Sequence, residues 1–429
     1  MITFDQLAAH FLGAYGNSLV ETPHFNRLAS QSLLFDFAFS NELDLNRWFD
    51  RIWSDQWPTA DSSEQIAWID AVNELGYESV LITDDPQVAA HRLAKFDRVI
   101  SIDQPKVQTA TTDLAETQLA NFFAQAIACL DRDFNEGQVY WIHSRGLAGA
   151  WDAPQAWREY FADEDDPAPP RFVNPPAGEW AEEEIDLDQI LGWQQAAAAQ
   201  VQVIDQCLGI FLDQLQQLAA DQSQHRLLLG VAGCRGFALG EHQRVGCDQR
   251  FYNENIHVPL MFSTLSASPD DWGIVPGRSM AMVTTELITS VLQTWLANDR
   301  DLLSQMQTET KLNNECDADF WLTLDCPFPD FQHDFILLAN ADVGFQMLQT
   351  HAWKIICGPQ EHVELYAKPE DRWEVNEISG RCPIVVEELK ELIQQVLLQV
   401  QDDKTTMKHN SISNELRIKL PLDLGQRID

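Results

Sequence analysis

The first 300 residues alternate between short apolar runs and longer segments with apolar residues at helical spacing. The apolar runs, which are typical of buried strands, lie at 1–4, 79–83, 98–102, 139–142, 227–231 and 258–262. The segments with helical spacing lie at 22–29, 66–75, 114–130, 190–220 and 284–296. This alternation predicts an α/β fold, in which helices cover both faces of a large, mostly parallel sheet.

The pattern changes after residue 298. Three short apolar runs with the spacing of hairpin strands lie at 335–338, 344–348 and 353–356. A helical segment follows at 385–400. We therefore expect an α/β domain at 1–310, a small C-terminal α+β subdomain with antiparallel strands and a helix at 311–402, and a polar tail at 403–429 to which the pattern assigns no element.

The chain is strongly acidic, with 66 Asp and Glu against 28 Lys and Arg and a formal net charge of −38. Such a charge repels polyanions, so neither nucleic acid nor a membrane is expected as a partner. A small anionic ligand would need a local basic pocket.

The eight cysteines are spaced singly, without a CxxC pair, which argues against a zinc ribbon or a disulfide framework. Free thiols indicate a reducing compartment. The sequence shows neither a signal-peptide pattern nor an apolar run long enough to cross a membrane. We expect a cytoplasmic protein, and a start upstream of Met1 stays open because the first strand begins there.

Five short segments carry a resemblance to a known family. They are Ile2-Thr3-Phe4-Asp5 with the glycine loop at 12–17, Thr22-Pro23-His24-Phe25, Val203-Ile204-Asp205, Leu239-Gly240-Glu241-His242 with Val258-Pro259-Leu260, and Trp353-Lys354 with Glu364-Leu365-Tyr366. In this order they resemble the sulfatase family of the alkaline phosphatase superfamily. The resemblance implies that family's α/β fold and its sulfuric-ester hydrolysis. That reaction needs a nucleophile, a divalent cation such as Ca²⁺ or Mg²⁺ that polarises the ester, and basic groups around the sulfate.

The nucleophile motif of the family is altered in this chain. The resemblance places a C/S-x-P-x-R motif, whose first residue becomes formylglycine, at Ser40, but Glu42 and Asp44 stand where Pro and Arg are required. The first cysteine of the chain is Cys129, so the cysteine form of the motif is excluded here. Ser40 is either a remnant nucleophile or a residue that turns the chain. Arg47 is either a remnant of the motif arginine, facing an anion pocket, or a surface helix residue.

The cation ligands are altered as well. Asp5, followed by Gln6, stands where sulfatases often have paired acids, so Asp5 is a possible ligand and Gln6 a weaker one. The resemblance places an Asp and a His or Asn at positions occupied by Cys234 and Arg235. A thiol is a poor ligand for Ca²⁺ or Mg²⁺, and Arg has only donors. We hypothesise that the Arg235 guanidinium pairs with Asp5 in place of the cation.

The basic groups are only partly present. Cys247 stands at the position of the family's lysine. His143, at the end of a predicted strand, and His242 are candidate remnants of catalytic histidines, and a structural role is the alternative for both. Arg145 lies close to His143 in the sequence and is, with Arg235, a candidate residue of an anion pocket.

These changes leave three interpretations open. The favoured one is a non-hydrolytic pseudoenzyme that needs no cofactor and binds a small anionic ligand or a protein partner. The second is an active sulfuric-ester or phosphoester hydrolase with a rearranged Ca²⁺ or Mg²⁺ site that uses Asp84, Asp85 or Asp152, although acids at such positions more often cap helices or form turns. The third is a structural or interaction protein with a closed pocket.

Overall fold

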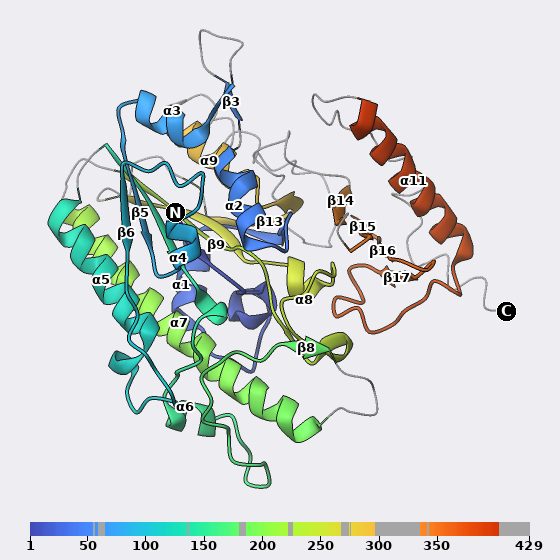
Figure 1. Cartoon of the computed structure of the whole chain (residues 1–429), viewed down its shortest axis with the longest axis horizontal. Helices are drawn as coiled ribbons and strands as arrows, with labels where there is room; N and C mark the ends of the chain where they lie inside the picture. The colour runs from blue at the N-terminus through green and yellow to red at the C-terminus, as the bar shows by residue number, and fades with distance from the viewer. Residues whose placement is uncertain are drawn as a thin grey trace, which may run out of the picture.

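The computed structural model describes residues 1–54, 56–58, 65–134, 137–179, 186–221, 226–266, 274, 276–296, 335–340 and 343–402. The first part of the expected subdomain and the expected tail at 403–429 lie outside the described residues. The described chain forms an eight-stranded sheet covered by helices and a separate four-stranded sheet that carries one long helix (Figure 1).

The eight-stranded sheet has the order β13-β2-β12-β9-β1-β7-β5-β6. In that order the strands are Gly277–Thr284, Leu33–Phe39, Leu260–Ser266, Arg226–Gly233, Ile2–Phe4, Gln138–Ser144, Glu78–Thr83 and Arg98–Ser101. Within this sheet β12 runs antiparallel to both of its neighbours, while the other pairings are parallel. The prediction of a large, mostly parallel sheet is therefore confirmed.

Helices pack on both faces of this sheet, as the alternation of strands and helices predicts. One face carries α1 (Pro23–Ser30), α5 (Gln118–Asp133) and α7 (Leu187–Asp221), whose apolar side chains share a core with β1 and β9. The other face carries α2 (Leu45–Ser54), α3 (Trp68–Glu74) and α9 (Leu287–Leu296). Side chains alternate along each strand between these two cores, which explains why the strands read as continuous apolar runs.

The sequence pattern missed three elements of the large sheet and its helices, and it placed one strand end wrongly. Strands β2 and β13 and helix α2 were not predicted, and the strand expected at 258–262 begins only at Leu260. Gly277, Arg278 and Ser279 at the start of β13 weaken its apolar pattern. Pro259 delays β12, because proline has no N–H to donate to a strand neighbour.

The C-terminal sheet consists of β14 (Phe335–Asn340), β15 (Phe345–Thr350), β16 (Trp353–Cys357) and β17 (Val363–Ala367), all antiparallel in sequence order. One of its faces contacts apolar residues of the large domain around Phe39, Leu43 and Ile256. Its other face packs against α11 (Pro383–Asp402). The sheet thus lies between α11 and the large domain.

The remaining elements are short. They are β3 (Gln56–Pro58), β4 (Gln65–Ala67), β8 (Gly178–Glu179), β10 (Ala238–Leu239), β11 (Arg244–Gly246), α4 (Pro86–Ala89), α6 (Gln155–Glu159), α8 (Asn253–Ile256) and 3-10 turns at Ala9–Phe11, Gly13–Tyr15, Leu114–Glu116, Gly146–Ala148 and Glu241–Gln243. A search of the described helices finds none with the length and apolar character that a membrane span requires.

Candidate functional site

Four neighbouring parallel strands end at the same edge of the large sheet. Phe4, the last residue of β1, lies between Ser144 of β7 and Gly233 of β9, and β5 pairs with the far side of β7. The residues that follow these strand ends therefore meet in one place: Asp5, Asp84, Asp85, Arg145, Cys234 and Arg235. This is the edge where open α/β sheets present their ligand sites.

Asp5 and Arg235 form a bidentate ion pair at this edge, which we call the strand-end pair. Arg235 donates from Nε to Asp5 Oδ1 at 2.7 Å and from Nη2 to Asp5 Oδ2 at 3.0 Å. Its Nη1 donates to the carbonyl oxygen of Leu43 at 2.7 Å. The Asp5 side chain is 3% exposed and that of Arg235 is 17% exposed. The structure thus brings together the two side chains whose pairing we predicted.

These residues do not fit a hard divalent cation. Both carboxylate oxygens of Asp5 accept hydrogen bonds from Arg235, whose guanidinium stays protonated because the Asp5 charge raises its pKa despite burial. Burial also raises the pKa of the Cys234 thiol, and it raises that of Cys247 to about 12, so both sulfurs are neutral. Within the part of the chain that the structure describes, no group of three or more His, Cys, Asp or Glu side chains is placed to hold a metal ion.

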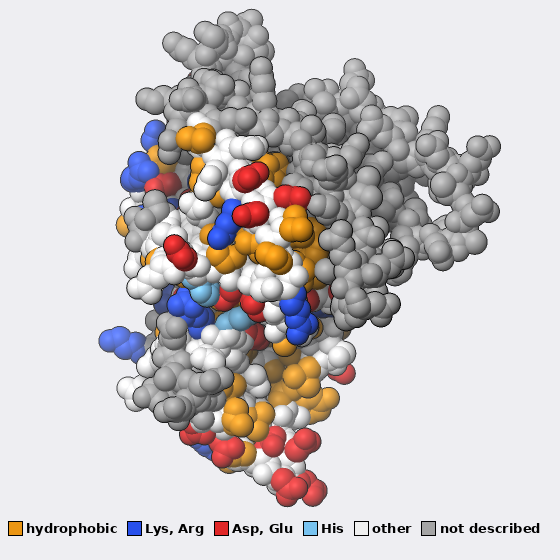
Figure 2. All heavy atoms as spheres, turned by 90° about the vertical axis from the view of Figure 1, so that its right-hand side faces the viewer, with side chains coloured by type: hydrophobic (Ala, Val, Ile, Leu, Met, Phe, Trp, Pro, Cys, Tyr) orange, Lys and Arg blue, Asp and Glu red, His pale blue; other side chains and the backbone are white. Residues whose placement is uncertain are grey.

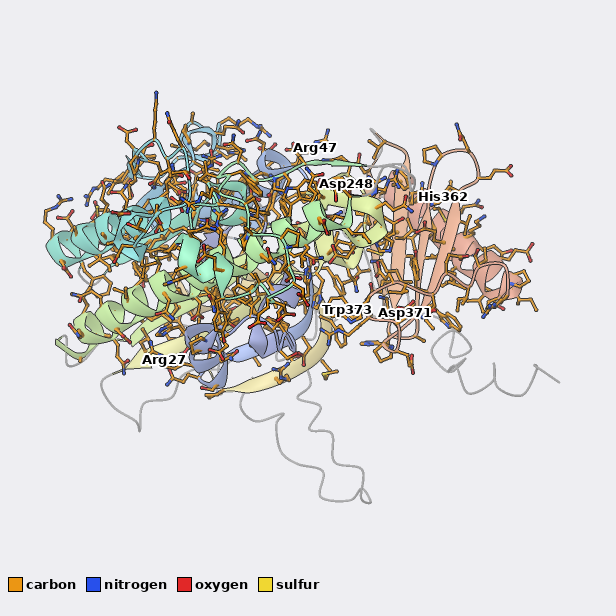
Figure 3. The ribbon with its side chains drawn as sticks, turned by 90° about the horizontal axis from the view of Figure 1, so that it is seen from below. Arg27, Arg47, Asp248, His362, Asp371 and Trp373 are labelled. Carbon is orange, nitrogen blue, oxygen red and sulfur yellow. The ribbon has the colours of Figure 1, made fainter. Side chains whose placement is uncertain are left out.

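The loop after β2 approaches the pair through its backbone. Ser40 is buried, and its hydroxyl donates to the carbonyl oxygen of Glu42 at 2.7 Å, which turns the chain. This contact agrees with the turn-forming alternative for Ser40. Arg47 is exposed in the first turn of α2, where its N–H donates to the Asp44 side chain (Figure 3). The loop therefore offers Arg235 a carbonyl group, from Leu43.

His143 lies in β7 and is fully buried beside the strand-end pair. Its Nδ1 is 3.0 Å from Thr3 Oγ1, which also accepts a hydrogen bond from Trp141 Nε1 at 3.1 Å. Its Nε2 is buried without a hydrogen-bond partner among the described residues. Burial lowers the pKa of His143 to about 4, and the Phe49 ring packs edge-on at 5.0 Å. The imidazole is therefore neutral.

The three acids that an active hydrolase with a rearranged site could use, Asp84, Asp85 and Asp152, each have a structural partner. Asp84 accepts the N–H of Arg145 at 2.8 Å, and burial raises its pKa to about 7. Asp85 caps α4 by accepting the N–H of Gln87. Asp152 is buried at the start of α5, where it accepts the N–H of Gln118 at 2.7 Å. These contacts match the cap and turn roles that acids commonly play at such positions.

Two predicted site residues lie in different surroundings. The Cys247 sulfur is 3.9 Å from the Leu43 carbonyl oxygen, so it is close to the strand-end pair. His242 instead bonds Glu254 and the backbone of Glu374, in a separate cluster that involves the C-terminal sheet. Gln6 has a positive φ of 57° at the turn directly after Asp5. The sequence did not mark Leu43 or Thr3 as site residues, because Leu43 acts through its backbone carbonyl and Thr3 is a hydroxyl residue within a strand.

Comparison by sequence identifies no relative: no family model matches the chain, and no curated protein matches it. Comparison of the structure does. A phosphonate monoester hydrolase of Agrobacterium radiobacter superposes with a TM-score of 0.65 at 14% identity, over 93% of this chain and 95% of that one. BT4656, solved in complex with its substrate D-glucosamine-2-N,6-O-disulfate, gives a TM-score of 0.65 at 14% identity, over 94% and 98%. BT1596, a 2-O GAG sulfatase, gives 0.62 at 14% identity, over 96% and 94%.

The chain therefore has the fold of the sulfatases and phosphonate monoester hydrolases, which is the alkaline phosphatase superfamily fold. The similarity extends over nearly the full length of both chains, including the C-terminal sheet. A fold of this kind supports many reactions, so the function has to be argued from the residues at the strand ends.

Proposed function

We propose that this protein is a sulfatase-like pseudoenzyme that does not hydrolyse esters and needs no divalent cation. The observation that carries the proposal is the strand-end pair. The guanidinium of Arg235 places a fixed positive charge against Asp5, with two short hydrogen bonds and a third to Leu43. A guanidinium can balance the carboxylate charge in this way, but it has no vacant orbital with which to polarise an ester oxygen.

The other requirements of the reaction are altered independently. The Ser40 hydroxyl is engaged by Glu42, and Cys247 replaces the expected lysine with a thiol that burial keeps neutral. His143 is neutral as well, because burial lowers its pKa to about 4. Catalytic groups act as a unit, so the loss of a single one can already remove most of the rate.

The chemistry of the site favours a ligand role over a catalytic one. Arg235 keeps a partly exposed guanidinium, and Arg145 lies beside the same strand ends, so a small anion is the ligand class that these residues fit. A protein partner that covers this edge is the second possibility. We place this role in the cytoplasm, where the six free cysteines of the described chain would stay reduced.

The proposal is tested by metal analysis together with turnover assays. The purified protein is dialysed against a chelator, analysed for bound metal, and assayed with aryl sulfate, aryl phosphate and aryl phosphonate esters with added Ca²⁺, Mg²⁺ or Mn²⁺. We expect no stoichiometric metal, an unchanged melting temperature with and without chelator, and no turnover above that of an Asp5→Ala variant. Glu164→Ala, which changes an exposed acid of the loop after α6, serves as the control.

The opposite result would establish the active alternative. Turnover that Asp5→Ala abolishes and Glu164→Ala preserves would show that the strand-end pair opens to admit a cation. Stoichiometric metal that survives dialysis would have the same meaning, since Asp5 would then be a ligand.

A further inference from the structure

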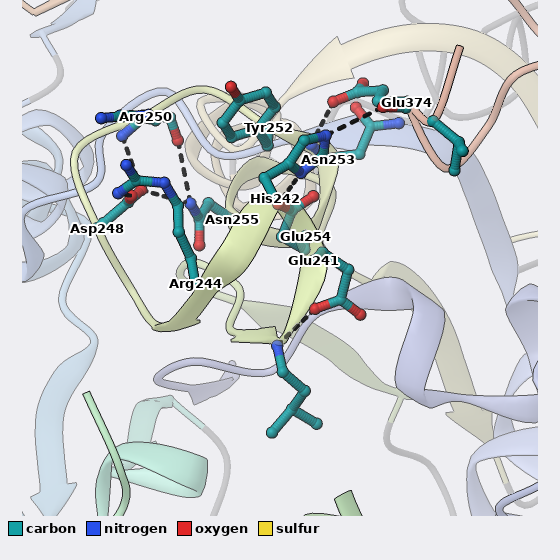
Figure 4. A network of polar contacts seen from close by, with 12 residues as sticks. Glu241, His242, Arg244, Asp248, Arg250, Tyr252, Asn253, Glu254, Asn255 and Glu374 are labelled. Carbon is teal, nitrogen blue, oxygen red and sulfur yellow. Dashed lines mark hydrogen bonds and ion pairs between the residues drawn. The ribbon is translucent and has the colours of Figure 1, made fainter. Parts of the chain in front are cut away.

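His242 belongs to the retained part of the sequence motif, but its side chain faces away from the strand-end pair. Nδ1 lies 2.8 Å from Oε1 of Glu254, and Nε2 lies 3.0 Å from the carbonyl oxygen of Glu374 (Figure 4). The ring stacks on Tyr252 at a centroid distance of 3.8 Å and an angle of 9°. The side chain is thus held in one orientation by contacts on both of its edges and on one face.

Both ring nitrogens of His242 face oxygen atoms that accept hydrogen bonds. A neutral imidazole has one N–H, so it can donate to only one of these two acceptors. The imidazolium has two N–H groups and satisfies both, because the carbonyl of Glu374 can only accept and the buried Glu254 carboxylate gains a counter-charge. The geometry therefore favours the charged form.

Glu374 joins His242 to a larger buried network, which we call the Glu374 cluster and which comprises His242, Glu254, Lys354, Lys368 and Glu374. Oε1 of Glu374 accepts from Lys354 Nζ at 2.7 Å and from Lys368 Nζ at 2.8 Å, and its Oε2 accepts from the N–H of Asn253 at 3.1 Å. The side chains of Lys354 and Glu374 are 0% exposed. Glu374 also has a positive φ of 57°, a conformation that costs free energy in a residue other than glycine.

The cluster spans the boundary between the two sheets. Lys354 belongs to β16, and Glu374 lies in the segment after β17, whereas His242 and Glu254 belong to the large domain. The same boundary includes the hydrogen bond from Arg372 Nη2 to the carbonyl oxygen of Tyr15. Figure 2 shows basic, acidic and histidine side chains gathered in a band across the middle of one face of the molecule.

The cluster also reaches the candidate site through α8. The carbonyl oxygen of Glu254 lies so close to Gly236 that a Cβ at that position would come within 1.9 Å of it. Gly236 donates its N–H to the carbonyl oxygen of Asn255 at 2.7 Å, and it directly follows Arg235. A shift of α8 would therefore move Arg235, which pairs with Asp5.

We infer that the imidazolium of His242 fastens the C-terminal sheet to the large domain, and that loss of its proton as the pH rises loosens this sheet. This inference does not depend on whether the protein hydrolyses esters.

The charges around His242 set the direction of this response. Burial opposes the charged form, but the hydrogen bond and charge of Glu254 and the contacts with Glu374 outweigh it and raise the pKa of His242 above 6.5. Glu241 lies next to it in sequence, and Tyr252 and Tyr366 contact its ring. Because the folded-state pKa is raised, the stabilisation is fully present below about pH 6.5 and is lost as the pH rises through the raised value.

Lys354 acts on the stability of the fold in the opposite sense at higher pH. Burial lowers the pKa of Lys354 to about 8, so its deprotonation favours the folded state as the pH rises above that value. Comparison of a variant with the wild type at each pH removes this contribution, because both proteins carry the same lysines.

The test combines hydrogen exchange with NMR of the histidine ring. Backbone exchange of β14–β17 is compared between the wild type and His242→Gln from pH 6 to pH 9, with strands β1 and β7 as an internal reference. We expect roughly tenfold or faster exchange of the C-terminal sheet in the variant at pH 6, as for loss of a charged hydrogen bond. This ratio should approach 1 by pH 9, since the wild type then also lacks the proton. NMR of the wild type at pH 6 should show protons on both ring nitrogens of His242.

The matched control is His362→Gln. His362 lies in the turn between β16 and β17, is exposed and pairs with Glu364 at 3.0 Å (Figure 3). Its replacement should leave the exchange ratio near 1 at every pH. A ratio for His242→Gln that does not change with pH, or a single ring proton on His242 at pH 6, would overturn the inference. The NMR arm uses wild-type protein, so it holds even if the variant folds poorly.

Discussion

The strand-end pair and the Glu374 cluster are both buried ionic groups, but they occupy opposite ends of one sequence motif. The pair contains the altered position Arg235, and it balances one carboxylate with one partly exposed guanidinium. The cluster contains the retained His242 and surrounds a carboxylate that is 0% exposed with two lysines. The comparison shows that two parts of one motif can have different structural roles: Arg235 pairs with Asp5 at the strand ends, and His242 joins the two sheets.

The largest effect should come from breaking the cluster at its centre. Glu374→Ala leaves two buried ammonium groups without their carboxylate, and we expect a loss of about 3–5 kcal/mol in the free energy of unfolding. Urea unfolding at pH 7 measures this loss. Glu370→Ala removes an exposed acid from the same segment and should change the stability by less than about 0.5 kcal/mol. A loss below about 1 kcal/mol for Glu374→Ala would mean that the lysines find other partners.

The strand-end pair should be somewhat less sensitive, because Arg235 is partly open to solvent. Arg235→Leu leaves Asp5 buried and unpaired, and we expect a loss of about 3 kcal/mol at pH 7. The double variant Asp5→Asn with Arg235→Leu should recover part of the stability. Asp5→Asn alone is measured as well. If the losses of Asp5→Asn and Arg235→Leu simply added in the double variant, the contact between the two side chains would carry no coupling energy.

The fold could be predicted from the sequence further than the site could. Apolar runs and helical spacing predict β1, β5, β6, β7, β9 and β12 and most of the long helices, because burial on two faces leaves a clear pattern, but they miss β2, β13 and α2. The pairing of Asp5 with Arg235 could also be predicted, since the resemblance places both residues at the family's cation site. The role of His242 could not, because its partners are a buried carboxylate and a backbone carbonyl contributed by Glu254 and Glu374. Contacts of this kind follow from the docking of one sheet on another, and no local pattern encodes them.

A third prediction concerns the pH dependence of stability that Asp84 causes at the strand ends. Burial raises the pKa of Asp84 to about 7, so the folded protein holds a proton between about pH 4 and pH 7 that the unfolded chain releases. The stability of the wild type should therefore fall, relative to Asp84→Asn, by about 2 kcal/mol or more as the pH rises through this window. This direction is opposite to that of His143, whose lowered pKa destabilises the fold as the pH falls below about 6.5. The free energy of unfolding is measured against pH for the wild type, Asp84→Asn and His143→Phe, which separates the effects of the two groups. Curves that run parallel for all three proteins would show that neither group has a shifted pKa.

The smallest effect should come from the exposed ion pairs beside the site. Arg51 of α2 bonds Glu42 at 2.9 Å and Glu286 at 3.2 Å, yet its side chain is 53% exposed. Water and salt screen such pairs, so Arg51→Ala should cost about 0–1 kcal/mol, and the cost should decline further in high salt. Urea unfolding at low and high salt checks this, with Arg235→Leu measured in parallel. The contrast depends on burial, because both arginines bond to a carboxylate at similar distances. If Arg51→Ala proved as costly as Arg235→Leu, the loop that carries Ser40 and Leu43 would depend on its outer charges, and the strand-end pair would not be what holds that loop in place.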